Sequence, residues 1–185
     1  ERLPVVVYTS ELSAEGVWHY VSPQIESLLG FTPKEWQADP TLWYRQMHPD
    51  DRDIQESLEE QAYQSGTRSF SSTYRMRRRD GSEVWVSDTA LILPPQEGAF
   101  PMVQGVLVDI TERMHAKALE SAIARINDSA GLSGGMDEFY RTIHEALRSV
   151  MFADNFFIAL YDKKTDMLRF PYFVDQNDAT PASAP

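Results

Sequence analysis

The N-terminal part of the chain consists of short apolar runs separated by turn residues. Residues 5–8 and 17–21 are rich in valine and aromatic residues and flank a turn-like segment, which predicts a β-hairpin. Helical patterns then break at Gly30 and again before Pro40, as expected for several short helices. Over residues 50–66 apolar side chains recur at helical spacing on a polar background, which predicts a longer helix with most of its surface exposed.

The hydrophobic period changes to two from residue 69 onward. Apolar and polar residues alternate over residues 69–77, as on a sheet with one solvent-exposed face. The Asp80-Gly81 pair then predicts a tight turn into a second strand that reaches Leu93. A further run rich in branched residues spans residues 102–110. Two strands, then helices, then three strands make an α+β order.

A polar helix is predicted from residue 111 to about residue 130, where Ala, Glu, Lys and Arg dominate. Its apolar residues are spaced alternately by four and three, so they form one narrow stripe that suits pairing with a neighbouring helix or domain. We therefore expect a homodimer contact along this helix. The stripe consists of Leu119, Ile123, Ile126 and Ala130.

A glycine-rich break at residues 131–135 separates this helix from a second set of apolar residues. An amphipathic pattern covers residues 136–150, and the runs 156–161 and 167–174 flank a turn, which predicts one helix and one hairpin. A lone hairpin is marginal in water, and a segment of ~40 residues buries too little surface to be stable. We therefore interpret residues 133–185 as a truncated second domain followed by a disordered tail.

Composition narrows the class of protein. The 185 residues are 42% hydrophobic with a formal net charge of −11, which indicates a globular chain that repels nucleic acid and anionic lipid. No apolar run is long enough for a membrane span and no signal peptide opens the chain, so we expect a soluble, cytoplasmic segment without membrane contact. Cysteine is absent, which excludes disulfides, thiolate metal sites and chromophores attached through sulfur, including cysteinyl-flavin and thioester-linked groups.

Four motifs in order connect the chain to a known family. Together they resemble a PAS domain with its C-terminal PAC segment, over more than half of the chain, whereas residues 134–178 look like the opening of a GAF domain. The PAS motifs are Tyr20-Val21-Ser22-Pro23 leading to Leu28-Leu29-Gly30-Phe31, His48-Pro49-Asp50-Asp51-Arg52, Tyr74 to Gly81 with Trp85, and Gly105 to Arg113.

The resemblance implies a fold and a division of the chain. The fold would be a five-stranded antiparallel sheet with short helices over one face, enclosing a cavity that holds a small molecule or is filled by side chains. A C-terminal linker helix and a partial GAF-like helix plus β-hairpin would follow. The expected parts are a PAS/PAC sensory domain (1–110), a linker or signalling helix (111–132) and a truncated GAF-like domain with its tail (133–185).

The resemblance also implies a sensory input module of a bacterial signal transduction protein, with a downstream histidine kinase or diguanylate cyclase outside this chain. In this interpretation a small molecule or partner binds the PAS domain and shifts the packing of the linker helix. A ligand-free dimerisation or adaptor module is the alternative. Enzymatic activity within these residues would need a catalytic constellation that the sequence lacks, so we do not expect an enzyme.

Two sets of residues are candidates for the sensory function. Asp109, Thr111 and Glu112 lie where the last strand becomes the linker helix, which couples pocket to output in similar domains. Asp109 and Glu112 also form an Asp-x-x-Glu relative of the capping box, so an ordinary helix cap is the alternative, while the resemblance favours the signalling role. The second set comprises pocket-lining candidates, for which aromatic core packing is the favoured alternative: Trp36, Trp43, Tyr44, Phe70 and Tyr74.

The histidines point to structural roles. The motif around His48 suggests a metal or acid/base cluster, but Pro49 and the two following aspartates favour a helix start. The sequence identifies no cofactor. The resemblance implies that a haem iron ligand would lie well inside the helix, and no histidine lies between Asp53 and Gly66, so haem is disfavoured, although His19 or His48 stays open for an unusual site. The pair formed by His144 and its acidic neighbour resembles a kinase phosphoacceptor, but strands follow it, so we favour a flank of the amphipathic helix.

The one basic cluster lies on the predicted strand at residues 69–77 and in the turn that follows it. Alternation places Arg75, Arg77 and Arg79 on one strand face, and the acidity of the chain favours a solvated face over a phosphate-binding patch, so nucleic-acid binding is not expected. The cluster consists of Arg75, Arg77, Arg78 and Arg79.

Overall fold

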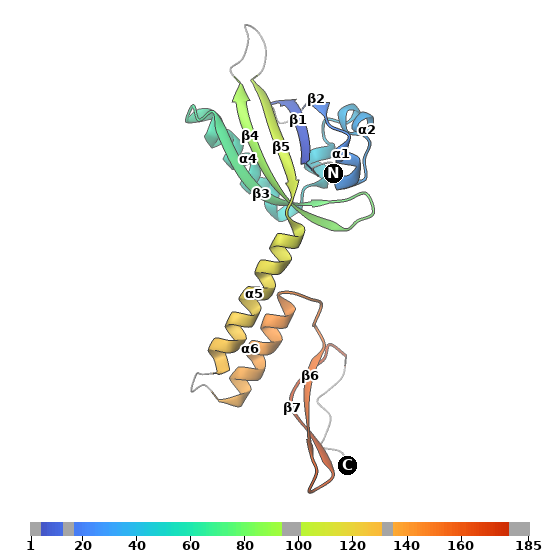
Figure 1. The fold of residues 1–185 in the computed structure, drawn as a ribbon, viewed down its shortest axis with the longest axis vertical. Coiled ribbons are helices and arrows are strands. Elements are labelled where there is room, and N and C mark those ends of the chain that lie inside the picture. The colour runs from blue at the N-terminus through green and yellow to red at the C-terminus, as the bar shows by residue number, and fades with distance from the viewer. Residues whose placement is uncertain (1–4, 13–16, 94–100, 131–134, 178–185) are drawn as a thin grey trace. The chain divides into compact units, whose positions relative to one another are not determined.

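Figure 1 shows the computed structural model, which describes residues 5–12, 17–93, 101–130 and 135–177. The disordered tail expected at the C-terminus falls mostly outside these ranges. The chain divides into two compact units, residues 1–112 and 113–185. Helix α5 (Thr111–Ala130) begins in the first unit and continues in the second.

A five-stranded antiparallel sheet forms the framework of the first unit (Figure 1). Its strand order is β2-β1-β5-β4-β3, so the last strand of the unit lies at the centre, between the first strand and the β3–β4 hairpin. The two hairpins that the turn signals predicted are both present, and the sheet that the resemblance implied is confirmed. The strands are β1 (Val5–Glu11), β2 (Trp18–Val21), β3 (Ser69–Arg77), β4 (Glu83–Leu93) and β5 (Met102–Asp109).

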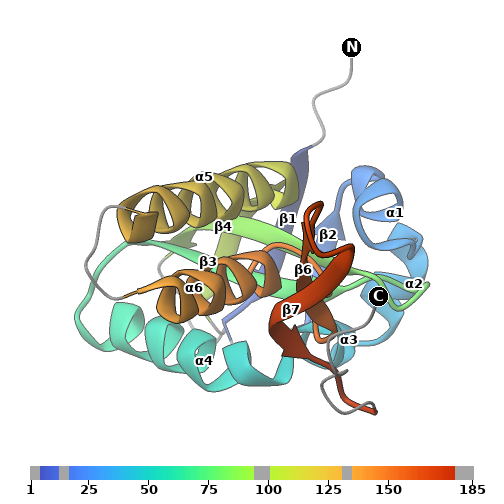
Figure 2. The same ribbon diagram turned by 90° about the horizontal axis from the view of Figure 1, so that it is seen from below.

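Four helices connect β2 to β3, and local chemistry sets where they begin and end. Gly30 ends α1 in a left-handed conformation with φ of 81°, which glycine adopts without steric cost. Thr32 and Glu35 form a capping box that starts α2. In Figure 2 the sixteen-residue α4 lies along β3, which it also contacts. The helices are α1 (Gln24–Leu29), α2 (Pro33–Ala38), α3 (Leu42–Gln46) and α4 (Pro49–Gln64).

The core of the first unit lies on the helix-covered face of the sheet. Inward positions alternate along each strand, so that Val84, Val86, Asp88 and Ala90 of β4 are all buried. Aromatic rings fill the space under the short helices, with Trp18 and Trp36 packed edge to face at 5.5 Å between ring centroids. One of the buried β4 residues is therefore a carboxylic acid.

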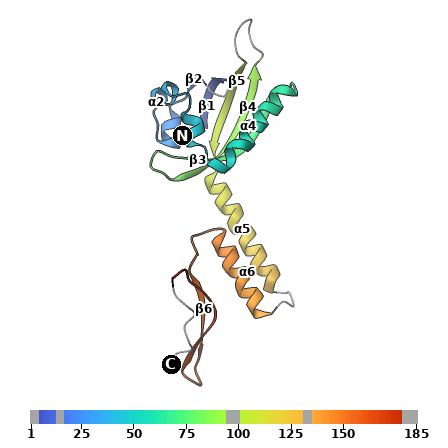
Figure 3. The ribbon, with the colours of Figure 1, turned by 180° about the vertical axis from the view of Figure 1, so that it is seen from behind.

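The second unit contains the rest of α5, helix α6 and a separate two-stranded sheet. In Figures 1 and 3 α6 runs alongside α5, and the pair is bridged by Arg125 and Glu145 at 3.4 Å. Leu119 and Ile123 of the predicted stripe are about half exposed, at 52% and 51%. The remaining elements are α6 (Met136–Arg148), β6 (Phe156–Asp162) and β7 (Met167–Val174).

Candidate functional site

A buried carboxyl group lies at the centre of the first unit. The Asp88 side chain on β4 is only 3% exposed and accepts hydrogen bonds from two phenols. The Tyr8 hydroxyl donates to both carboxyl oxygens at 2.9 and 3.2 Å, and the Tyr74 hydroxyl donates to Oδ2 at 2.9 Å. The Trp43 indole N–H donates to the Tyr74 oxygen at 3.2 Å. We call these four residues the Asp88 cluster; they join β1, β3, β4 and α3.

Small residues on the neighbouring strands make room for the cluster. Tyr8 of β1 pairs with Gly105 of β5, which in turn pairs with Ala90 of β4. A Cβ atom on Gly105 would approach the Tyr8 ring and hydroxyl to within 2.6 to 2.7 Å, closer than carbon atoms tolerate. Glycine at this position therefore lets the Tyr8 phenol cross β5 and reach the Asp88 carboxyl two residues along β4.

A small cavity of about 30 Å³ adjoins the carboxyl. This volume suits a water molecule or a group of similar size, whereas pockets for drug-sized ligands measure roughly 300 Å³ or more. Aromatic rings and carboxyl groups dominate the wall, and no basic residue is among the described lining residues. The lining consists of Tyr8, Ser10, Glu11, Leu12, Trp18, Trp43, Glu59, Phe70, Asp88 and Val103.

The electrostatics of the cavity favour a protonated carboxyl. Burial raises the pKa of Asp88 to about 7, although the hydrogen bonds from Tyr8 and Tyr74 partly oppose that rise. The charge of Glu59, on α4, adds to the increase. Burial also raises the pKa of Glu59 itself, against a hydrogen bond of 3.0 Å from Gln55. Two carboxyl groups with raised pKa values therefore share one cavity.

The five aromatic candidates from the sequence occupy different places. Trp43 and Phe70 line the cavity, and Tyr74, which is not part of the cavity wall, donates a hydrogen bond to the Asp88 carboxyl. Trp36 instead packs between Trp18 and Phe31, away from the described cavity wall. Tyr44 lies under the Arg52 guanidinium at 4.7 Å. The structure thus brings three of the five together.

Sequence reasoning missed Asp88 and Tyr8, the two residues with the most informative contacts. A signal was present, because the alternation that places Val84 and Val86 on the inner face of β4 also places Asp88 there. Nothing in the sequence shows which phenols would meet that carboxyl, since Tyr8 lies eighty residues away along the chain.

The junction between the sheet and α5 has a second group of specific contacts. The Asp109 carboxylate accepts from the Thr111 backbone N–H at 2.9 Å and from Arg78 at 2.9 Å. The Thr111 hydroxyl accepts from the Trp85 backbone N–H at 3.0 Å, and the Trp85 carbonyl accepts from the Ile110 N–H at 2.9 Å. The first turn of α5 is therefore tied to β4 by both side-chain and backbone bonds.

The capping box expected at this junction is only half formed. Asp109 does accept from the first helical N–H, as expected. The Glu112 side chain is exposed and makes no hydrogen bond to any described residue, so the expected contact from Glu112 back to the strand is wrong. The hydrogen bond from the Trp85 backbone N–H to the Thr111 hydroxyl connects the helix start to the sheet instead.

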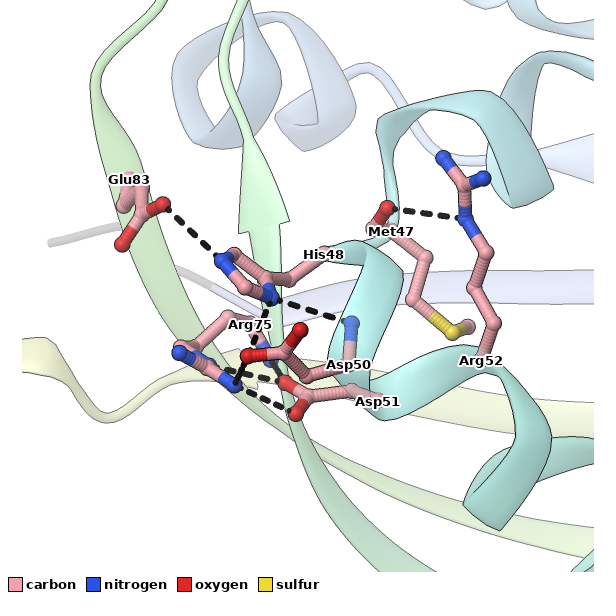
Figure 4. Close-up of polar contacts among 7 residues, drawn as sticks. All are labelled: Met47, His48, Asp50, Asp51, Arg52, Arg75 and Glu83. Carbon is pink, nitrogen blue, oxygen red and sulfur yellow. Dashed lines mark hydrogen bonds and ion pairs between the residues drawn. The ribbon is translucent and has the colours of Figure 1, made fainter.

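The motif around His48 forms a helix start (Figure 4). The His48 Nδ1 accepts from the Asp50 backbone N–H at 3.2 Å, with Pro49 in the first helical turn. Asp51 holds the Arg75 guanidinium through two bonds of 2.7 and 3.0 Å and accepts from its backbone N–H at 2.8 Å. These contacts serve a structural role, because they start α4 and attach it to β3. Within the described residues, no three His, Asp or Glu side chains are grouped to hold a metal ion.

The arginine cluster differs from the solvated face that we expected. Arg75 pairs with Asp51, Arg78 with Asp109, and Arg79 with Glu35. The expectation holds for Arg77, which is exposed and lacks an ion pair to the described residues, and for Arg79, which is exposed despite its ion pair. It is wrong for Arg75 and Arg78, which are partly covered because the start of α4 and the α5 junction place carboxylates beside them.

His144 also differs from its expected position on the flank of α6. It is 5% exposed, with Nδ1 at 2.9 Å from the Tyr172 hydroxyl and Nε2 at 2.6 Å from the Ala153 carbonyl. The flank assignment is wrong because the hairpin folds over this face of the helix. Covered and bonded at both nitrogens, His144 lacks the exposure of a phosphoacceptor.

Comparison with known proteins places the fold of the first unit. Residues 19–107 match the family model described as the PAS fold. The methyl sulfide methyltransferase-associated sensor of Methanosarcina acetivorans is 30% identical over 127 residues, which are 68% of this chain. The chain spans only 13% of that relative's length.

Solved structures of similar fold also point to the PAS fold. The N-terminal domain of a diguanylate cyclase with PAS/PAC sensor from Marinobacter aquaeolei is 25% identical, with a TM-score of 0.52 over 60% of this chain and 99% of that one. A sensory box histidine kinase/response regulator from Burkholderia thailandensis is 21% identical, with a TM-score of 0.53 over 68% and 92% of the two chains. Within the described ranges, no helix combines the length and the apolarity needed to cross a bilayer. Residues 19–107 thus match the PAS fold family, and the first unit has a PAS-like α+β fold.

Proposed function

We propose that this chain is a sensory input module of a signalling protein, in which a change at the Asp88 cluster is relayed to helix α5. The sensor named in the sequence comparison and the diguanylate cyclase sensor among the solved structures support this role. The observation that carries the proposal is a shared strand. Asp88 and Trp85 both lie on β4, and Trp85 bonds directly to the first turn of α5.

The relay requires two arrangements of the junction with different stabilities. A stimulus shifts the balance between them only if it binds one arrangement better than the other. The four bonds at the junction provide discrete contacts that can form or break. Asp109 and Thr111 are the relay residues in this scheme, because they make the junction contacts. The Glu112 side chain makes no contact with the described residues that would include it in the relay.

The same proposal gives roles to other segments of the chain. The segment from Tyr74 to Arg113 would be the PAC motif, and residues 133–185 the start of a GAF-like domain. The chain would act in the cytoplasm of a bacterium, as a homodimer through Leu119 and Ile123, with no catalysis of its own. A histidine kinase or diguanylate cyclase output would lie in a further part of the protein.

A ligand-free dimerisation module is the second candidate, and the size of the cavity favours it. A volume of about 30 Å³ leaves no room for a metabolite beside the aromatic lining. In this version the first unit is a packed scaffold, and the exposed stripe on α5 holds two chains in register.

Native mass spectrometry of the purified chain, compared with its denatured mass, separates these versions. A retained small mass that is lost on denaturation supports a ligand-binding sensor. A ligand-free dimer that dissociates in Ile123→Glu supports the dimerisation module, provided that the matched control Ala124→Glu, at the next exposed position of α5 and outside the stripe, leaves the dimer intact. A ligand-free monomer contradicts dimerisation through α5.

A further inference from the structure

We propose that the Asp88 cluster is a proton-responsive site: the buried Asp88 carboxyl takes up one proton, the phenol hydrogen bonds rearrange, and the change reaches α5 through β4. The uptake of the proton stands on the geometry of the cavity. Its transmission names a stimulus for the module proposed above and rests on that proposal.

The first argument is the absence of a compensating charge. Every element packed around the Asp88 carboxyl presents neutral or acidic groups within the described residues. The groups are Tyr8, Ser10 and Glu11 from β1, Trp18 from β2, Phe70, Ser72 and Tyr74 from β3, Val103 from β5, Trp43 from α3, and Glu59 from α4. The nearby Arg75 belongs to the opposite face of β3, where it pairs with Asp51. A buried carboxylate without a cation is costly, so proton uptake is the available way to neutralise it.

The second argument is a change in hydrogen-bonding roles. The ionised Asp88 only accepts, which matches the two phenols that donate to it. When a proton from solvent binds one carboxyl oxygen, Asp88 becomes a donor and needs an acceptor. The carboxyl O–H then needs a phenol that accepts or another acceptor nearby, and the Tyr8 hydroxyl, whose hydrogen bonds among the described residues go to Asp88 alone, can turn toward the cavity.

A neighbouring serine provides a further acceptor for the neutral form. Ser72 pairs directly with Asp88 across the β3–β4 ladder, so the two side chains share the inner face. Its hydroxyl is buried and has no hydrogen-bond partner among the described residues. The direction of the pKa changes agrees, because burial raises the pKa of both Asp88 and Glu59, and the charge of Glu59 raises the pKa of Asp88 further.

The route to α5 is short. Asp88 is three residues from Trp85 on β4, and Trp85 bonds to Thr111 and Ile110 through its backbone. Tyr8 and Tyr74 lie on the strands β1 and β3, so a movement of either phenol acts on the sheet around β4. The Trp43 indole N–H, bonded to the Tyr74 oxygen, reports the state of the cluster.

The test is a pH titration of the chain by nuclear magnetic resonance, following the Trp43 indole N–H and the Thr111 backbone amide from about pH 5 to about pH 9. The expected result is an inflection of both signals near pH 7 that disappears in Asp88→Asn. Glu59→Gln should move the midpoint to lower pH, because it removes a negative charge that favours the proton. Glu60→Gln is the matched control, since exposed Glu60 accepts from Gln64 as Glu59 does from Gln55, and it should leave the midpoint unchanged.

Tyr74→Phe covers the case in which Asp88→Asn does not fold. It removes a bond that stabilises the carboxylate, so the midpoint should rise. A flat Trp43 signal in the unmodified chain overturns the proposal, as does an inflection that persists in Asp88→Asn. If Trp43 titrates while Thr111 does not, the proton is not the stimulus for α5. The sensory module itself is then still decided by the mass measurement above.

Discussion

The two compact units differ in how their sheets are covered. In the first, helices cover one face, and the inner residues of β4 and β5 are buried. In the second, the hairpin carries aromatic rings on both faces. Phe156 and Tyr172 pack with His144, whereas Phe157, Phe170 and Phe173 contact one another, and Phe157 remains 59% exposed. A sheet with two apolar faces needs cover on both, so only the first unit shows a finished core within the described residues.

Truncating a leucine in each unit tests this difference most directly. Leu107 is fully buried on β5, so Leu107→Ala should lower the free energy of unfolding by about 3 kcal/mol. Leu160 on β6 is 41% exposed, so Leu160→Ala should cost the second unit less than about 1 kcal/mol. Urea unfolding followed by tryptophan fluorescence reports the first unit, which holds all four tryptophans, and hydrogen exchange reports the hairpin. Equal losses of stability in the two variants would contradict the difference in core formation between the two units.

His144 is the exception within the second unit, because it is both buried and bonded. His144→Ala removes its ring and leaves the Tyr172 hydroxyl and the Ala153 carbonyl without this partner. We expect a loss of about 2 kcal/mol in the stability of the second unit. The exposed His115 on α5 is the matched control, and His115→Ala should change almost nothing. Hydrogen exchange of the β6–β7 amides measures both. A loss no larger than that of the control would show that the hairpin is not held by α6.

Asp88 gives the first unit a distinctive dependence on pH. Its pKa is raised from 3.8 to about 7 by folding, so its contribution to stability is fully present below about pH 3.8 and is lost as the pH rises through about 7. In this window the unfolding free energy should fall by about 1 kcal/mol per pH unit, and Asp88→Asn should remove that slope. Urea titrations at several pH values measure it. The same slope in both proteins would contradict an uncompensated carboxyl at position 88.

Asp51 should show the opposite sign. The Arg75 guanidinium holds the pKa of Asp51 below its usual value, so its stabilisation is present above about pH 3.8 and is lost on acidification. Asp51→Asn should therefore cost about 1 kcal/mol at pH 7 and progressively less in acid. Urea unfolding at pH 7 and at lower pH measures the cost. If it did not shrink as the pH fell, the Asp51–Arg75 pair would not be its source.

The smallest effect is expected at the junction with α5. Thr111→Val keeps the shape of the side chain but leaves the Trp85 N–H without its acceptor, at a cost of ~1 kcal/mol or less. Hydrogen exchange should show faster opening of the Trp85 amide and the first turn of α5, with no change in β6 and β7. Unchanged exchange at Trp85 would remove this bond from the relay.

Much of the fold could be predicted because it depends on local patterns. The period-two alternation from Ser69, the Asp80-Gly81 turn and the break at Gly30 each act through neighbouring residues, and each produced the expected element. The helix start at His48 was predicted for the same reason. Predictions failed where a distant group decided the outcome: carboxylates from other elements pair with Arg75 and Arg78, and the hairpin covers His144.

The candidate site divides in the same way. By itself the sequence determined the order of the elements, the inward position of Asp88 on its strand and the lack of any thiol chemistry. Only the tertiary structure decided that Tyr8 and Tyr74 bond the same carboxyl, that Gly105 makes room for one of them, and that the remaining cavity is about 30 Å³. The physical reason is that periodicity sets which way a side chain points, whereas its partners and its solvation depend on strand order and on packing between residues far apart in the chain.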